Sequence, residues 1–198
     1  MPLAYHLILS CYGFWLPNDP RGSWSNIIRN DKLKSFGPAS KVNTRSSLAN
    51  KPHSFKDRIA AKHALSYPPV ILNEKQSLSV AKGFAFRAIH SNIRIHACAI
   101  MPDHVHMVIA NDGRRIEMIS NQLKGAATRQ FKTDGLHPLS QYKDKDGNTP
   151  SPWAVGQWKV YITNEKQFDN TIRYVQQNPV KAGLKHQQWN FVTPPQYR

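Results

Sequence analysis

Apolar residues along the chain recur with two periods, one typical of strands and one typical of helices. Residues 3–11 (LAYHLILSC) form a short apolar run that ends in a turn-rich loop, which predicts a buried strand. Residues 93–101 and 104–110 are rich in alternating and branched positions and flank the turn signal Pro102-Asp103, which predicts a hairpin. The run WKVYI at residues 158–162 predicts a fourth strand.

Three longer stretches have the apolar spacing of amphipathic helices. The first spans residues 74–91 and follows Asn73, a residue that commonly caps helices. The second spans residues 112–132. The third begins after the capping residue Asn164 and is expected to end at the Asn178-Pro179 break. The apolar face of the first helix is expected to contain Leu78, Ala81, Phe84 and Ala85.

The predicted order is strand, helix, hairpin, helix, strand, helix. An α+β fold with a central antiparallel sheet and helices on one side satisfies this order, in the split β-α-β arrangement of ferredoxin-like and RRM-like domains. We expect residues 1–198 to form one domain. It would carry a polar, basic insertion at about residues 21–70, with a helix within residues 54–65, and an irregular tail at about residues 184–198.

The charge balance narrows the class of partner. Lys and Arg number 27 against 12 acidic residues, which gives a formal net charge of +15. An excess of this size on a small globular chain favours a polyanion, with nucleic acid the leading candidate. Charge alone does not separate DNA from RNA, a ribosome surface or anionic lipid.

The two cysteines and the apolar segments indicate a compartment. Cys11 and Cys98 are far apart and lack metal-binding spacing, so we expect free thiols in a reducing cytoplasm. No apolar stretch approaches the length of a membrane span, and the N-terminal segment lacks the features of a signal peptide. We therefore expect a cytoplasmic protein that does not bind membranes.

The triplet His104-Val105-His106 is the sharpest local motif. Side chains at positions i and i+2 of a strand point to the same face, so the two imidazoles would project together and begin a divalent-metal site. Val105 would point to the opposite face, toward a helix layer. A triplet of this kind also arises by chance among nine histidines, and surface polarity alone explains it equally well.

Tyr174 and Asn178 form a second candidate pair. They are four residues apart on a predicted helix and so share one face. Taken alone, ordinary helix packing and a helix stop before Pro179 explain them. Combined with the histidines they suggest chemistry, because a divalent cation bound to a phosphate offsets the weak nucleophilicity of a tyrosine side chain. Two imidazoles and one amide oxygen suit Mg²⁺ or Mn²⁺ better than a closed structural zinc site.

These two motifs carry a resemblance to a known family. The segment MPDHVHMVI resembles the HUH motif (histidine, hydrophobic residue, histidine) of single-tyrosine transposases, and IRYVQQNPVKAGL is similar to the tyrosine segment of the REP-associated branch. The start of the chain, YHLILSCYGFWLPNDPRGSW, also resembles some members. The resemblance covers roughly residues 3–20 and 85–195 and leaves residues 21–70 poorly matched, because the insertion after Trp24 is longer than the usual loop.

The resemblance implies an HUH-nuclease type of fold and a specific reaction. Tyr174 would attack a DNA phosphodiester, form a 5′-phosphotyrosine and free a 3′-hydroxyl, and rejoining would reverse this step. His104, His106 and Asn178 would bind the metal. Asparagine at this third position is the form of the REP-associated branch, where insertion-sequence relatives often have glutamine. The substrate would be single-stranded DNA beside a short hairpin, and relatives include both monomers and homodimers. No nucleotide cofactor is expected, since no glycine-rich nucleotide-binding motif is present.

Further basic and aromatic residues are candidates for DNA contact. Phosphate contacts are expected from Lys124, Arg129, Arg173 and Lys181. The insertion adds Arg29, Lys32, Lys34, Lys41, Arg45 and Lys51, although charge runs are more often solvated surface. Trp153 and Trp158 are candidates for base stacking, although core packing is commoner for tryptophan. His6, His90 and His96 have no partner motif and are treated as structural.

A second class of function stays open. A non-catalytic, domesticated nucleic-acid-binding module would use the same RRM-like sheet. Such modules place stacking aromatics on the central strands, where this chain has histidines. A covalent protein–DNA product separates the two hypotheses, because both predict salt-dependent binding to nucleic acid.

Overall fold

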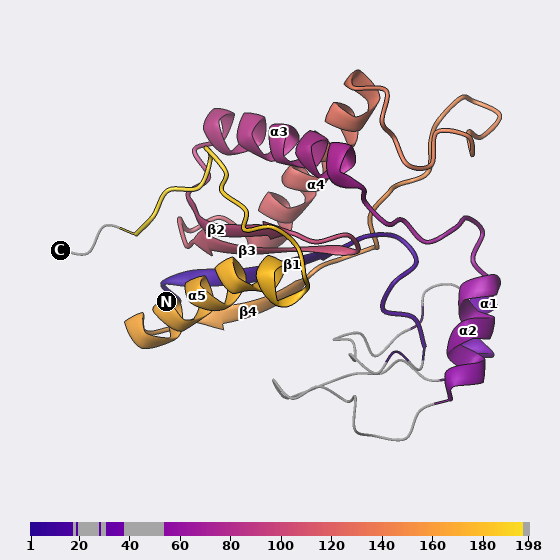
Figure 1. Cartoon of the computed structure of the whole chain (residues 1–198), viewed down its shortest axis with the longest axis horizontal. Coiled ribbons are helices and arrows are strands. Elements are labelled where there is room, and N and C mark those ends of the chain that lie inside the picture. Colours follow the sequence, from indigo (N-terminus) through magenta and orange to yellow (C-terminus); the bar gives the residue numbers. More distant parts are fainter. Residues whose placement is uncertain (18, 20–27, 29–30, 38–53, 196–198) are drawn as a thin grey trace.

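A four-stranded antiparallel sheet forms the centre of the protein. The computed structural model describes residues 1–17, 19, 28, 31–37 and 54–195 (Figure 1). The strands are β1 (Ala4–Ser10), β2 (Ile95–Ile100), β3 (His104–Ala110) and β4 (Trp158–Ile162), in the order β2-β3-β1-β4. This is the order of a split β-α-β fold, so the predicted α+β class is confirmed.

Two long helices cover one face of this sheet. They are α3 (Glu74–His90) and α4 (Ile116–Thr133), which follow β1 and β3 as the split β-α-β order requires. The side chain of Asn73 accepts a hydrogen bond from Gln76 N, and the Gln76 side chain accepts one from Asn73 N, so the predicted cap is present. The predicted apolar face is partly wrong, because Leu78 is half-exposed and Val80 is buried in its place.

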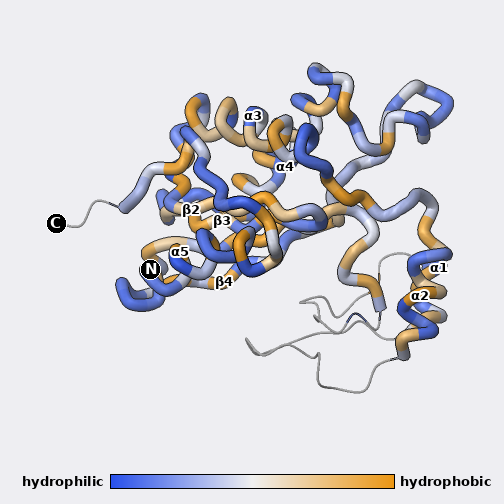
Figure 2. Tube along the Cα trace, viewed as in Figure 1, coloured by the Kyte–Doolittle hydropathy of each residue, from blue (hydrophilic) through white to orange (hydrophobic). Residues whose placement is uncertain are grey.

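The main hydrophobic core lies between these helices and the sheet. Strand alternation sends every second side chain into it, including Leu7, Leu9, Val105 and Met107. Figure 2 shows this apolar material running through the strands at the centre of the molecule. Helices α3 and α4 approach closely where Gly83 meets Ala127, since a Cβ on Gly83 would lie 2.7 Å from Ala127 Cα.

The last helix, α5 (Glu165–Lys181), covers the opposite face of the sheet. Ile172 and Val175 pack there against a smaller apolar cluster from the strands. The expected placement of helices on one side therefore holds for α3 and α4, and α5 is an addition on the other side. Asn164 caps α5 as predicted, through Gln167 N. The predicted end at Asn178 is wrong, because the helix continues through Pro179 to Lys181. A proline is tolerated there because it removes one hydrogen bond from a last turn that is otherwise still bonded.

The segment after α5, described as far as residue 195, is irregular and protects the edge strand β2. The side-chain amide of Gln187 donates to Ile100 O and accepts from Ile100 N. Thr193 N donates to Ile95 O, and Phe191 is buried in the main core. The tail thus satisfies backbone groups that an edge strand would leave open.

Two short helices lie within the predicted insertion. They are α1 (Asp31–Lys34) and α2 (Phe55–His63), the second within the predicted range. Leu33 and Ala61 join Leu16 in a small separate cluster. The expected DNA contacts of Arg29, Lys41, Arg45 and Lys51 lie outside the described residues. No helix in the described ranges is long and apolar enough to cross a membrane.

Candidate active site

The sheet register places three histidines on the face that α5 covers. His104 and His106 alternate with Val105, which is fully buried in the main core, so both imidazoles point away from α3 and α4. In the neighbouring strand β1, Ile8 pairs with His106 and His6 pairs with Val108. His6 therefore lies diagonally across from His106 on the same face.

The three imidazoles and one carboxylate form a continuous chain of contacts. His104 Nε2 lies 2.9 Å from His106 Nε2. On the outer sides, Asp103 Oδ1 lies 2.5 Å from His104 Nδ1, and His6 Nε2 lies 3.0 Å from His106 Nδ1. The structure therefore adds Asp103 and His6 to the residues expected from sequence.

Tyr174 of α5 lies directly against this cluster. Its ring centroid is 5.6 Å from that of His106 and 5.8 Å from that of His6, with the rings edge to face in both pairs. The tyrosine is 45% exposed, while the next residue, Val175, is fully buried. The phenol ring is thus fixed against the imidazoles on one side and remains accessible to solvent on the other.

The direction of α5 places Asn178 toward the His104 end of the site. At the start of the helix Phe168 packs against His96, at the beginning of β2. The helix then passes Tyr174 and continues toward the end of β2, where the hairpin leads into His104. Asn178 follows Tyr174 by one turn on the same face. Its Nδ2 atom is buried and has no hydrogen-bond partner within the described structure.

The contacts constrain where protons reside. An ionised carboxylate only accepts, so His104 Nδ1–H donates to Asp103 and His104 Nε2 presents its lone pair. Burial lowers the pKa of His106 well below its usual 6.5, and the neighbouring His104 and His6 lower it further. His106 is consequently neutral near pH 7 and suited to bind a metal.

These residues fit a divalent cation such as Mg²⁺ or Mn²⁺. The two Nε2 atoms face each other at 2.9 Å, so both nitrogens could bind one ion, and neutral imidazoles suit such a role. Asn178 could supply a third ligand, because its buried Nδ2 atom has no hydrogen-bond partner in the described structure and the amide oxygen and nitrogen exchange places on rotation. Across the described ranges, no three His, Cys, Asp or Glu side chains are grouped to hold a metal.

The basic residues expected to contact DNA lie in three different places. Lys124 is 9% exposed, and its ammonium donates to the carbonyls of Ala154 and Gly156 ahead of β4. This contact holds the loop and engages the ammonium group that was expected to contact a phosphate. Arg173 and Lys181 are exposed on α5, beside Tyr174 and at the end of the helix.

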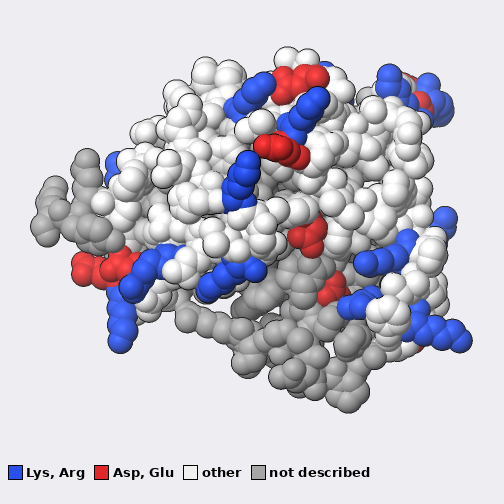
Figure 3. Space-filling view, viewed as in Figure 1, with Lys and Arg blue, Asp and Glu red and all other residues white. Residues whose placement is uncertain are grey.

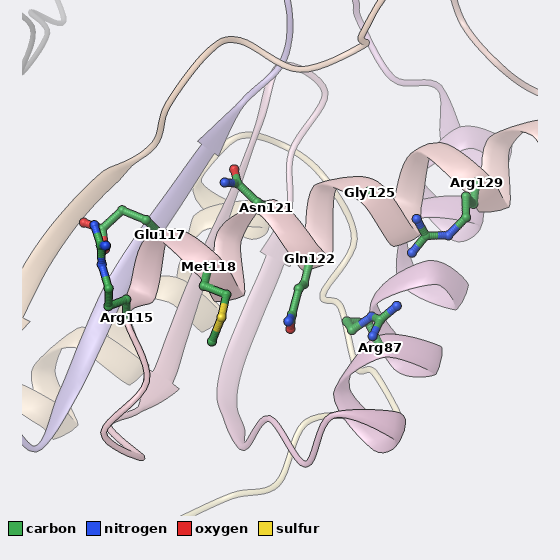
Figure 4. A pocket seen from close by; sticks show the side chains of 8 residues that line it. All are labelled: Arg87, Arg115, Glu117, Met118, Asn121, Gln122, Gly125 and Arg129. Carbon is green, nitrogen blue, oxygen red and sulfur yellow. The ribbon is translucent and has the colours of Figure 1, made fainter.

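Arg129 lies on the other side of the sheet. It borders a hollow of about 610 Å³ between α3 and α4, together with Arg87, Arg115 and Met118 (Figure 4). In the view of Figure 3, Lys and Arg side chains are spread over the visible face rather than gathered in one patch.

Of the two tryptophans considered for base stacking, one is buried in the core and the other lies nearer the surface. Trp153 is 4% exposed in the main core and donates to Thr128 Oγ1, so the stacking role considered for it is wrong. Trp158 is partly exposed and packs edge to face against Trp15. His96 has a structural contact with Thr193 O, as expected, but the structural reading of His6 misses its place beside His106.

Solved structures similar to this chain include two transposases. One is described as the REP-associated tyrosine transposase bound to a REP hairpin, at 14% identity and a TM-score of 0.47, covering 93% of this chain and 70% of that one. The other is a proposed transposase from Deinococcus radiodurans, at 15% identity and a TM-score of 0.43, covering 90% of this chain and 91% of that one. Likenesses at this level carry no argument about function. No curated protein matches the chain.

A family model provides the assignment. The model described as "Transposase IS200 like" matches residues 67–178, more than half of the chain. The matched segment contains His104, His106, Tyr174 and Asn178, and it excludes His6. The chain belongs to the IS200-like transposase family.

Proposed function

We propose that the protein is a metal-dependent, single-strand DNA endonuclease and strand-transfer enzyme that uses Tyr174 as its nucleophile. The observation that carries this proposal is the contact of the half-exposed Tyr174 ring with His106 and His6. The paired imidazoles of His104 and His106 lie beside this phenol, and the proposal adds the amide of Asn178, one helix turn after Tyr174, as the third group of the site. Each group serves transesterification at phosphorus.

The reaction balances without an external energy source. The Tyr174 oxygen forms a bond to phosphorus, the bond from phosphorus to the 3′ oxygen breaks, and the phenol proton leaves as the 3′ oxygen gains one. The product is a 5′-phosphotyrosine and a free 3′-hydroxyl. Since the covalent ester retains the bond energy, attack by another 3′-hydroxyl rejoins DNA and releases the tyrosine.

The other residues have supporting roles in this proposal. His104, His106 and Asn178 would hold a Mg²⁺ or Mn²⁺ ion, which supplies charge neutralisation at the scissile phosphate. Tyr174 is positioned by Ile172 and Val175, which fix α5 on the sheet. Arg173 and Lys181 of α5, and Arg129 of α4, would contact phosphates and so position the strand. The substrate would be single-stranded or hairpin DNA, bound by a monomer or a homodimer.

The rival function is a non-catalytic binding module with an RRM-like sheet. Such a module stacks bases on an open sheet face. Here α5 packs on β2 and β3 on one face, and α3 and α4 bury the other. The central strands β1 and β3 carry His6, His104 and His106 on the face toward α5, where such a module would place stacking aromatics, and this favours the nuclease.

The test is incubation of the protein with labelled single-stranded oligonucleotides that carry short hairpins, with Mn²⁺ or Mg²⁺, followed by denaturing gel electrophoresis. A labelled band that migrates with the protein and disappears with excess chelator is expected. Mass spectrometry should map the attached nucleotide to the peptide that contains Tyr174. Cleavage that leaves no covalent adduct, or an adduct on another residue, would contradict the assignment.

A further inference from the structure

We propose that His6 is a positioning residue for His106: its Nε2 atom accepts the His106 Nδ1–H and thereby directs the His106 Nε2 lone pair at the cation. The inference rests on the proposed function, because it assumes the cation site of His104 and His106. It assigns a role to a strand β1 residue that lies outside the segment matched by the family model.

The two candidate ligands, His104 and His106, have the same arrangement of contacts around their rings. Their Nε2 atoms face each other at 2.9 Å, where one cation can meet both. Each Nδ1 atom has a partner on its far side, Asp103 Oδ1 for His104 and His6 Nε2 for His106. A neutral imidazole that ligates through Nε2 carries its proton on Nδ1, and that proton needs an acceptor.

Burial makes the His6 contact difficult to replace. His106 is 5% exposed, so bulk water has little access to its Nδ1 atom. The β1–β3 register holds the two residues on adjacent strands, with Ile8 opposite His106 and His6 opposite Val108. The acceptor is therefore placed by backbone hydrogen bonds on both strands and not by a mobile loop.

A histidine suits this position because it can reverse the direction of the hydrogen bond. Without a cation, a His104 that is neutral and donates Nδ1–H to Asp103 would present a lone pair at Nε2, and a proton on His106 Nε2 would then make the 2.9 Å contact. His106 Nδ1 then accepts from His6 Nε2–H. With a cation at His106 Nε2, the His106 proton would be on Nδ1, and His6 would accept it through Nε2 and carry its own proton on Nδ1. A carboxylate at this position would only accept.

Ring packing is the structural alternative. The His6 ring lies against His106 at 5.1 Å and against Tyr174 at 5.8 Å, so the residue also fills space. Two substitutions separate the roles. His6→Phe keeps a ring and loses the acceptor, whereas His6→Gln loses the ring and keeps an acceptor and a donor.

The experiment measures Mn²⁺ binding to the whole protein without DNA, by electron paramagnetic resonance titration of free Mn²⁺. We expect His6→Phe to weaken binding by about 10- to 100-fold, the usual effect of losing such an outer partner. His6→Gln should bind within a few-fold of the parent, and His90→Phe, on the exposed surface of α3, should not change binding. Parent-like affinity of His6→Phe overturns the proposal, as does equal weakening by Phe and Gln.

Two further measurements distinguish a wrong cation site from a wrong role for His6. If His104→Ala binds Mn²⁺ as tightly as the parent, the cation site itself is wrong. If His104→Ala loses binding while His6→Phe retains it, only the role of His6 is wrong. Histidine ¹⁵N chemical shifts of the unmodified protein with Mg²⁺ need no folded variant. They should show His106 protonated on Nδ1, and protonation on Nε2 in the Mg²⁺-bound protein overturns the proposal.

Discussion

The two faces of the sheet are built from the same strands and have opposite characters. Toward α3 and α4, Leu7 and Met107 are fully buried in an apolar core. The adjacent residues Ile8 and His106 point to the other face, where α5 leaves room for a polar cluster. Because side chains alternate between the two faces of a strand, a residue that stabilises the core and a residue of the candidate site can be neighbours in the sequence.

Helix α5 repeats this division on its own surface. Val175 is fully buried against the strands, and the adjacent Tyr174 is 45% exposed beside the histidines. The candidate site thus depends on the apolar residues of the sheet and of α5 for its rigidity. Substitutions on the two faces should therefore have separable effects, on activity for one and on stability for the other.

The largest expected effect is the loss of covalent adduct in Tyr174→Phe. Removal of the phenol oxygen should reduce adduct formation by at least about 10⁴-fold, on the scale seen when a nucleophile is removed. DNA binding and thermal stability should change little, because the ring and its packing remain. The matched control is Tyr161→Phe, which alters a similarly exposed tyrosine of β4 and should retain activity. An adduct formed by Tyr174→Phe at the parent rate would show that another residue attacks.

The next effect is the loss of metal-supported cleavage in His104→Ala. One ligand and its hydrogen bond to Asp103 are removed, so cleavage should fall by about 10²-fold or more at a fixed Mn²⁺ concentration. The free energy of unfolding should change by less than about 1 kcal/mol, since the His104 side chain is partly exposed. Full activity of this variant, or of the parent in excess chelator, contradicts the metal role.

Substitutions on the sheet face that packs against α3 and α4 should lower stability and leave activity unchanged. Met107→Ala leaves a cavity among fully buried side chains and should lower the free energy of unfolding by about 2–5 kcal/mol. Urea denaturation measures this change. Cleavage per folded molecule should stay close to that of the parent. A variant that is stable but inactive would mean that the two faces are coupled.

The smallest expected effect concerns Lys124, a charged residue of α4 that is buried on the apolar side of the sheet. Burial lowers the pKa of Lys124 to about 8, whereas the unfolded chain keeps this proton to about pH 10.5. The unfolded state binds more protons between these values, so the contribution of Lys124 to stability rises with pH across that window. The stability of the parent relative to Lys124→Met should thus increase by about 2 kcal/mol from pH 8 to pH 10.

The comparison with Lys124→Met is needed because two buried thiols act in the opposite sense. Burial raises the pKa of Cys11 and Cys98, so the unfolded state releases their protons first and stability falls above about pH 9. Both proteins carry these thiols, and their effect cancels in the difference. A pH-independent difference in urea stability would show that the ammonium keeps its ordinary pKa.

Periodicity predicts much of this fold, since alternation over residues 104–110 and the caps at Asn73 and Asn164 are local signals. The end of α5 was not predictable from Pro179, because a proline near the end of a helix removes only one bond. Lys124 has the spacing of a surface charge. Its burial depends on the loop that returns across α4 to supply the carbonyls of Ala154 and Gly156.

Some residues of the candidate site can be recognised from sequence spacing, whereas His6 can be recognised only from the pairing of two distant strands. His104 and His106 share a strand, and Tyr174 and Asn178 share a helix turn, so each pair is visible from spacing alone. The place of His6 depends on β1 pairing with β3 in one register, a contact between positions 100 residues apart. A pattern within β1 does not contain that information.

Anomalous diffraction at the manganese edge from crystals soaked in Mn²⁺ tests the central claim most directly. The account predicts one strong peak within about 2.3 Å of His104 Nε2 and His106 Nε2, on the side of Asn178, with the Tyr174 hydroxyl facing the same open space. A Mn²⁺ ion bound elsewhere, with these two nitrogens still in contact with each other at concentrations that support cleavage, would contradict it.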